Sequence, residues 1–159
     1  EEQNGIVYDY FVFMTCTDVC RPANLLDTVI SQALDDQAVD SIFAARATHK
    51  NFWHAPNKGD SVKLQRVLPW MAEYSNRQIR QPIFREDTGV CCITKAVYLR
   101  QYGDRLGRNC SHVAYDFPLD IDIHTEHDLL LADQGLRRFI NSNDEAVRIY
   151  TKHGSVYGS

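Results

Sequence analysis

Three candidate metal ligands occupy every second position of one short stretch of this chain. Asp120, Asp122 and His124 alternate with apolar residues within residues 119–124. Because side chains on a strand point to opposite faces with a period of two, these three would share one face. Carboxylate and imidazole groups are common ligands of divalent metals. The pattern predicts a strand that presents a metal site, with the alternative that Asp120 and Asp122 are solvated edge-strand residues.

A helix is expected directly after this stretch. Thr125, followed three residues later by Asp128, has the spacing of a helix N-cap. Apolar residues at three- and four-residue steps then make one helix face, formed by Leu129, Ala132, Leu136, Phe139 and Ile140. Acidic side chains where a strand leads into a helix usually lie at the carboxyl edge of an α/β sheet, where such folds bind ligands.

Length and composition favour a single globular domain over residues 1–159. The chain has 44% hydrophobic and 24% charged residues, and its net charge of -4 argues against general nucleic-acid binding, which needs a basic face. No apolar run approaches the roughly 20 residues that a membrane-spanning helix requires. The five cysteines lack paired metal-type spacing, so we expect reduced thiols and a cytoplasmic protein.

The N-terminal part has the order of an α/β unit. Residues 8–14 form an aromatic and β-branched run that is typical of a buried strand. A helical stripe follows over residues 25–34, and residues 40–45 read as a second strand. Two strands separated by a helix are expected to run parallel through a right-handed crossover.

A polar turn, residues 15–22, connects the first strand to the first helix. Thr15, Thr17 and Arg21 would face a bound anion at the carboxyl end of the strand. The alternative is that Thr17 or Asp18 caps the helix, which is the commoner role of such residues.

Residues 46–86 show little sustained periodicity and contain both tryptophans. A stretch of this length is more typical of an arm, a lid or a dimer contact than of a simple loop. Phe52, Trp53 and Trp70 would supply apolar contact area in a subunit interface, or they would cover the sheet of their own chain.

The next segment, residues 76–89, is rich in arginine, whose planar fork of donors matches a carboxylate or phosphate. An anionic ligand is therefore expected. Residues 89–94 then read as a buried strand, residues 95–102 as a helix and residues 111–115 as another strand.

The order of four motifs over residues 8–140 resembles the acylneuraminate cytidylyltransferase family, which includes CMP-sialic acid synthetases and Kdo cytidylyltransferases. The motifs are YDYFVFMTCTDVCR, DSIF, RQ followed by PIFREDTG, and DIHTEHDLLLAD. The resemblance implies an α/β fold with a Rossmann-like nucleotidyltransferase sheet and an extended dimerisation arm, here residues 46–86, that exchanges contacts in a homodimer. It also implies transfer of CMP from CTP to a nonulosonic (2-keto) sugar acid, with release of pyrophosphate.

By the same resemblance, a divalent metal (Mg²⁺ or Mn²⁺) is held by two aspartates at alternate positions. Asp122 matches the first of them, and His124 stands in place of the second. Imidazole is a poor ligand for Mg²⁺ but an acceptable one for Mn²⁺. Asp120 would compensate as a third ligand.

The remaining site residues are also implied by the resemblance. Asp122 and Arg21 are the catalytic candidates. Arg77, with Gln78 in the Arg-Gln pair, would bind the sugar carboxylate. The other substrate-binding positions are Arg85, which falls on a family arginine, Thr15, which replaces a sugar-contacting glutamine, and Cys92, which replaces a sugar-contacting tyrosine.

The family also has an N-terminal strand and a glycine-containing, Lys/Arg-rich loop that binds CTP, for which this sequence offers no counterpart. We therefore expect the chain to be an N-terminally incomplete cytidylyltransferase that is inactive alone, or a non-catalytic sugar-acid-binding or dimerising module. An unrelated metalloenzyme that adds His127 to the acidic stretch is a third hypothesis. His127 counts against it, because its side chain should turn away after the helix cap.

Overall fold

The computed structural model describes residues 2–56, 64–73, 76–117 and 119–140. The chain divides into two compact units. The first contains the described residues of Glu1–Arg46 and Glu86–Ser159, and the second is Ala47–Arg85. The bounds of the second unit nearly coincide with the 46–86 insertion expected from the sequence.

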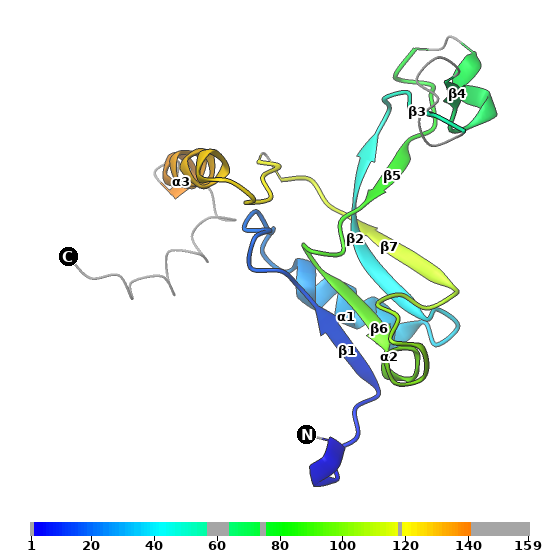
Figure 1. Ribbon diagram of the computed structural model, residues 1–159, viewed down its shortest axis with the longest axis vertical. Coiled ribbons are helices and arrows are strands. Elements are labelled where there is room, and N and C mark those ends of the chain that lie inside the picture. The colour runs from blue at the N-terminus through cyan, green and yellow to red at the C-terminus, as the bar shows by residue number, and fades with distance from the viewer. Residues whose placement is uncertain (1, 57–63, 74–75, 118, 141–159) are drawn as a thin grey trace. The chain divides into compact units, whose positions relative to one another are not determined.

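The fold is mixed α/β, with a sheet that contains both parallel and antiparallel pairs (Figure 1). Its strands are β1 (Tyr10–Phe13), β2 (Ser41–Thr48), β5 (Ile83–Glu86), β6 (Cys92–Lys95) and β7 (Cys110–Ala114), in the order β1-β6-β2-β5 with β7 also paired to β2. The helices are α1 (Leu25–Asp35), α2 (Ala96–Tyr102) and α3 (Glu126–Ile140), with a short 3-10 helix, η1 (Glu2–Asn4), near the start.

The expected parallel relation of the first two long strands is confirmed, with one addition. β1 and β2 are each antiparallel to β6, so they run in the same direction with β6 between them. Cys92 of β6 stands opposite Phe13 on one side and Phe43 on the other. β7 pairs parallel to β2, and α1 connects β1 to β2.

The core of the first unit lies between α1 and the sheet. Leu25, Val29 and Ala33 are the buried residues of the helix, and they cluster with Ile42 of β2 and Ile93 of β6. These helix positions are four residues apart, so they lie on one face, as the sequence predicted. Figure 1 shows α1 lying against the sheet.

The predicted capping of the first helix is wrong. α1 begins at Leu25, its N-cap is Asn24 in the left-handed region with φ 64°, and this residue makes no side-chain cap hydrogen bond. Asp18 lies too far upstream and instead accepts a hydrogen bond from Thr15 Oγ1 at 2.8 Å. Thr17 is also outside the helix, and its carbonyl accepts a hydrogen bond from Ile123 N.

The acidic stretch, residues 119–124, does not form the expected regular strand. Its described ladder contact is an isolated antiparallel bridge between Asp122 and Asp18. A longer ladder does not develop because the facing segment is the polar turn, which is itself irregular. The alternation survives nevertheless: Leu119, Ile121 and Ile123 are partly buried, while the residues between them are exposed.

The helix after this stretch starts as predicted. Asp128 N donates to Thr125 Oγ1 at 3.2 Å, and Thr125 N donates to Asp128 Oδ2 at 2.8 Å, which is a reciprocal cap. The hydrogen bond from the Thr125 side chain is the main cause that lowers the pKa of Asp128.

The apolar face expected for α3 is only partly buried. Ala132 is buried and Leu136 is half-buried, whereas Leu129 is 57% exposed. The side chains of Phe139 and Ile140 lie outside the described residues. Close packing occurs at Gly135, where an added Cβ would come within 2.7 Å of the Leu119 side chain.

The second unit contains β3 (Trp53–His54), β4 (Gln65–Arg66) and the 3-10 helix η2 (Pro69–Ala72). β3 and β4 pair antiparallel, and the Arg66 guanidinium lies over the Trp53 ring at 4.3 Å from its centroid. Met71 is buried, while Phe52 and Trp53 are 42% and 50% exposed. In the described part of the chain, no helix is both long and apolar enough to cross a membrane.

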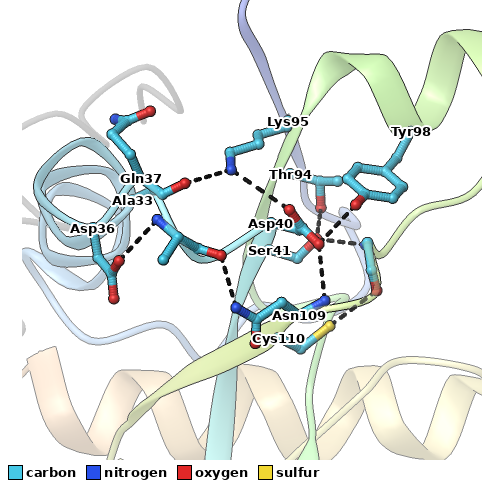
Figure 2. Close-up of polar contacts among 12 residues, drawn as sticks. Ala33, Asp36, Gln37, Asp40, Ser41, Thr94, Lys95, Tyr98, Asn109 and Cys110 are labelled. Atoms are coloured by element: carbon cyan, nitrogen blue, oxygen red, sulfur yellow. Dashed lines mark hydrogen bonds and ion pairs between the residues drawn. The ribbon is translucent and has the colours of Figure 1, made fainter.

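A polar network ties the ends of β2, β6 and β7 together around Asp40 (Figure 2). Tyr98 Oη donates to Asp40 Oδ2 at 2.7 Å, Asn109 N donates to the same oxygen at 2.9 Å, and Lys95 Nζ lies 3.5 Å from Oδ1. The hydrogen bond from Tyr98 is the main cause that lowers the pKa of Asp40. Close by, Thr94 Oγ1 donates to Ser41 Oγ at 2.8 Å.

Replacing Asp40 with Asn is expected to lower the free energy of unfolding at pH 7 by about 1–3 kcal/mol, because charge-assisted hydrogen bonds from Tyr98 and Asn109 are lost. The pKa of Asp40 is lower in the folded chain than in the unfolded chain. Its carboxylate therefore stabilises the fold above the unfolded pKa, and this contribution is lost as pH falls through the folded pKa. Urea unfolding at several pH values measures the difference, which should shrink below about pH 4.

Asp104→Asn is the matched control, because Asp104 is exposed in the loop after α2. It should leave the unfolding free energy nearly unchanged at every pH. A constant difference between wild type and Asp40→Asn from neutral to acidic pH would contradict the role of the Asp40 charge.

Candidate functional site

The polar turn after β1 is docked on the turn that precedes β6. Thr15 N donates to Gly89 O at 2.8 Å. The Arg21 guanidinium donates to the main-chain carbonyls of Thr15, Gly89 (3.2 Å) and Val90 (2.7 Å). Arg21, a catalytic candidate from the sequence, thus has its guanidinium engaged with the main chain, where it holds the two turns together.

The sequence did not single out Asp18 and Gly89 as site residues, yet they lie at the centre of this contact. Asp18 Oδ2 accepts from Thr15 Oγ1 at 2.8 Å, and Thr15 Oγ1 also donates to Gly89 O at 3.2 Å. A Cβ on Gly89 would overlap the Asp18 carboxylate and come within 2.9 Å of Thr15 Oγ1. Only glycine therefore leaves room for this arrangement. The signal in the sequence was Thr-Gly ahead of a buried run, which suggests a close backbone approach.

Two of the three predicted metal ligands contact one another beside this turn. His124 Nε2 lies 2.8 Å from Asp122 Oδ2. The main chains of Asp122 and Asp18 form an isolated antiparallel β-bridge. Ile123 N donates to Thr17 O at 3.0 Å, which fixes the main chain between the two side chains. The side chains of Asp122 and His124 are 43% and 73% exposed, so both are accessible to a ligand.

Asp120, the third expected ligand, is directed elsewhere. Its Oδ1 lies 3.7 Å from Arg46 Nε. Within the described residues, no group of three or more His, Cys, Asp or Glu side chains is placed to hold a metal ion. The expected trio is therefore not assembled, because the irregular main chain and the Arg46 charge separate Asp120 from Asp122 and His124.

Of the predicted sugar-binding residues, one is fully buried and another has its hydroxyl engaged within the chain. Cys92 is fully buried in the sheet, and burial raises the pKa of its thiol to about 11. A neutral thiol with no exposed surface is not placed to contact a sugar. Thr15 is half-buried, and its hydroxyl is engaged by Asp18 and Gly89.

The arginine-rich segment of the second unit lines a separate pocket of about 340 Å³. Its lining residues are Ala47, Thr48, His49, Lys50, Arg77 and Arg80. Arg80 Nη1 donates to His49 O at 3.0 Å and to Asn51 Oδ1 at 2.8 Å, which holds its guanidinium in place. The predicted residue Arg77 thus lies with Arg80, from the same arginine-rich segment, and with Lys50, which the sequence had not assigned to a site.

The other two predicted substrate-binding residues lie outside this lining. Gln78 is exposed next to Arg77, and Arg85 is an exposed residue of β5. The pocket gathers positive charge, so it suits an anion, in line with the ligand class expected from the sequence.

No protein-family model matches this sequence, and none of the curated proteins matches it either.

Gly89→Ala is expected to lower the free energy of unfolding by about 1–3 kcal/mol, because the new methyl group displaces the Asp18 carboxylate from Thr15. The double variant Asp18→Ala/Gly89→Ala removes most of that overlap. Its loss should be smaller than the sum of the two single losses, and urea unfolding of all four proteins measures the coupling. Additive losses would show that the contact between residues 18 and 89 is not the cause.

Proposed function

We propose that this chain is a cytidylyltransferase of the CMP-sialic acid synthetase type, which uses a nonulosonic sugar acid as the acceptor of CMP from CTP. The observation that carries the proposal is the cationic pocket of the second unit, with Arg77 in its lining. This arginine is the one that the sequence resemblance associates with the sugar carboxylate. The volume of about 340 Å³ falls within the range of about 300–1,000 Å³ that is usual for small-molecule sites.

The charge of the pocket supports an acidic sugar rather than a neutral one. A carboxylate accepts two parallel hydrogen bonds from a guanidinium fork, and such charge-assisted pairs are about twice as strong as neutral ones. Lys50 adds a point charge on the same lining. His49 and Asn51 hold Arg80 in position, which reduces the entropy lost when a ligand binds.

The first unit supports the nucleotide part of the proposal. Asp122 and His124 are in contact and exposed, so these two residues would hold a divalent metal. A carboxylate and an imidazole together suit Mn²⁺ better than Mg²⁺. When bound, the metal would neutralise charge on the transferred phosphoryl group.

In the proposed reaction, the anomeric hydroxyl of the sugar acid attacks the α-phosphorus of CTP. A bond forms from the anomeric oxygen to phosphorus, the bond to the bridging oxygen breaks, and pyrophosphate leaves as the hydroxyl proton is released. Such a reaction needs positioning and charge neutralisation more than covalent help. Arg21 contributes by holding the polar turn, whose residue Asp18 forms a main-chain β-bridge with Asp122.

The proposal extends to fold family, assembly and location. The mixed sheet would be the Rossmann-like nucleotidyltransferase sheet, and the second unit would be the arm that exchanges contacts in a homodimer. Exposed Phe52 and Trp53 on that unit support an apolar interface. Unpaired cysteines, of which Cys16 and Cys110 are exposed, suit a reducing cytoplasm.

A non-catalytic sugar-acid-binding or dimerising module is the second candidate. It is favoured by the position of the cationic pocket, whose lining residues all belong to the second unit. Such a module needs the Arg77 pocket and tolerates loss of Asp122.

Calorimetric titration of N-acetylneuraminic acid into the chain tests the pocket. We expect binding that Arg77→Ala weakens by about 10-fold or more, because a charge-assisted hydrogen bond contributes about 1.5–3 kcal/mol. The methyl ester of the same sugar should bind as weakly to wild type as the acid binds to the variant. Arg108→Ala, which removes an exposed arginine of the first unit, is the control and should leave the affinity unchanged. Equal affinity for acid and ester would contradict the proposed carboxylate recognition.

Titration of CTP with Mn²⁺, followed by an assay for CMP-sugar, separates the two candidates. The module hypothesis predicts sugar-acid binding without CTP binding or turnover. Formation of CMP-sugar that disappears in Asp122→Asn would instead show a competent enzyme and overturn the module hypothesis.

A further inference from the structure

Arg46 contacts three residues that precede Asp122: Phe117, Leu119 and Asp120. Its Nη1 donates to Phe117 O at 3.0 Å, and its Nη2 donates to Leu119 O at 2.5 Å. Its Nε lies 3.7 Å from Asp120 Oδ1. One guanidinium group therefore contacts the main chain at two points and a carboxylate at a third.

The guanidinium is itself held from the other side. Arg46 Nε donates to Tyr115 Oη at 3.1 Å, and the group lies over the Tyr115 ring at 4.7 Å from its centroid. Tyr115 Oη donates to Asp87 Oδ2 at 2.9 Å, and Asp87 N donates to Ala44 O of β2 at 2.9 Å. Burial raises the pKa of Tyr115 to about 12, so its hydroxyl stays protonated and able to donate at neutral pH.

The residues that Arg46 contacts come before Asp122 in the chain. A second set of contacts attaches Asp122 and Ile123 to the polar turn. Asp122 and Asp18 form a main-chain β-bridge, and Ile123 N donates to Thr17 O. Residues 119–125 form no regular strand or helix that would fix their main chain by itself. The position of the Asp122 carboxylate therefore depends on these main-chain contacts and on the contacts that Arg46 makes with the preceding residues.

We infer that Arg46 is a positioning residue, which holds Phe117, Leu119 and Asp120 so that Asp122 faces the polar turn beside His124. The inference rests on the proposed function only where Asp122 is taken to bind a metal. Arg46 itself contacts neither Asp122 nor His124 in the contacts described above, and it acts through the main chain that precedes them.

The geometry requires arginine at this position. The two carbonyl oxygens and the Tyr115 hydroxyl are bonded by three different nitrogens of one planar group. Lysine keeps the charge near Asp120 but offers a single ammonium group, which cannot reproduce the fork. Arg46→Lys therefore separates the role of the fork from the role of the charge.

Hydrogen exchange followed by NMR on the complete chain is the closing experiment. In Arg46→Lys, the Ile123 amide, which donates to Thr17 O, should exchange about 10-fold faster or more, because local opening becomes easier. The Ala44 amide, which donates to Cys91 O in the core, should keep its rate. Arg105→Lys is the matched control, since Arg105 also stacks on an aromatic ring, that of Phe13, but has no described contact with residues 117–124.

An unchanged exchange rate at Ile123 in Arg46→Lys, or an equal increase in Arg105→Lys, would overturn the inference. If Arg46→Lys also speeds exchange at Ala44, the fold as a whole is loosened, and Tyr115→Phe then decides. That variant keeps the ring but removes the hydroxyl partner of Arg46, so it should speed exchange at Ile123 alone. No change at Ile123 in Tyr115→Phe would count against the inference.

Titration of Mn²⁺ followed by electron paramagnetic resonance gives a second readout. If wild type binds Mn²⁺, the affinity in Arg46→Lys should fall about 10-fold or more, as for other residues that orient ligands. Equal affinity in both proteins would overturn the inference. If wild type binds no Mn²⁺, the metal part of the proposed function fails, and the exchange rates at Ile123 still decide the role of Arg46.

Discussion

The hydrogen bonds from Arg21 to the main chain are the interaction on which the rest of the candidate site depends. They join the turn after β1 to the turn before β6, through the carbonyls of Thr15, Gly89 and Val90. Unpaired carbonyls in a half-buried turn would cost about 1–3 kcal/mol each. With the turn in place, Asp18 lies against Gly89, and its main chain forms a β-bridge with Asp122. Removing these hydrogen bonds would weaken the attachment of Asp122 to the polar turn.

Two arginines of the first unit therefore serve the main chain. Arg21 supports the turn that faces Asp122, and Arg46 holds the segment that leads to it. Both guanidinium groups donate to carbonyl oxygens, which the five donors of arginine can satisfy in a fixed plane. By contrast, the pocket of the second unit gathers Arg77, Arg80 and Lys50 on one lining. The same residue type thus supports structure in one unit and supplies the charge of a candidate anion pocket in the other.

Much of the fold was predictable from local patterns. The run 8–14 contains β1, the stripe beginning at Leu25 became α1, and the expected helix 95–102 is α2 to within one residue. The cap of α3 at Thr125 and Asp128 was read from spacing alone. These elements follow from side-chain periodicity and capping, which act over a few residues. The 119–124 strand was overpredicted, because a strand needs a partner ladder and the facing segment is a turn.

The sequence by itself determined which side chains are available and on which side of the main chain they lie. Asp120, Asp122 and His124 alternate with partly buried apolar residues, as their spacing required. Only the tertiary structure decided their partners: Asp120 lies near Arg46, which is distant in the sequence, while Asp122 and His124 contact each other. Local periodicity sets the direction of a side chain, but the charges and carbonyls that surround it come from other elements, whose positions depend on how the whole core packs.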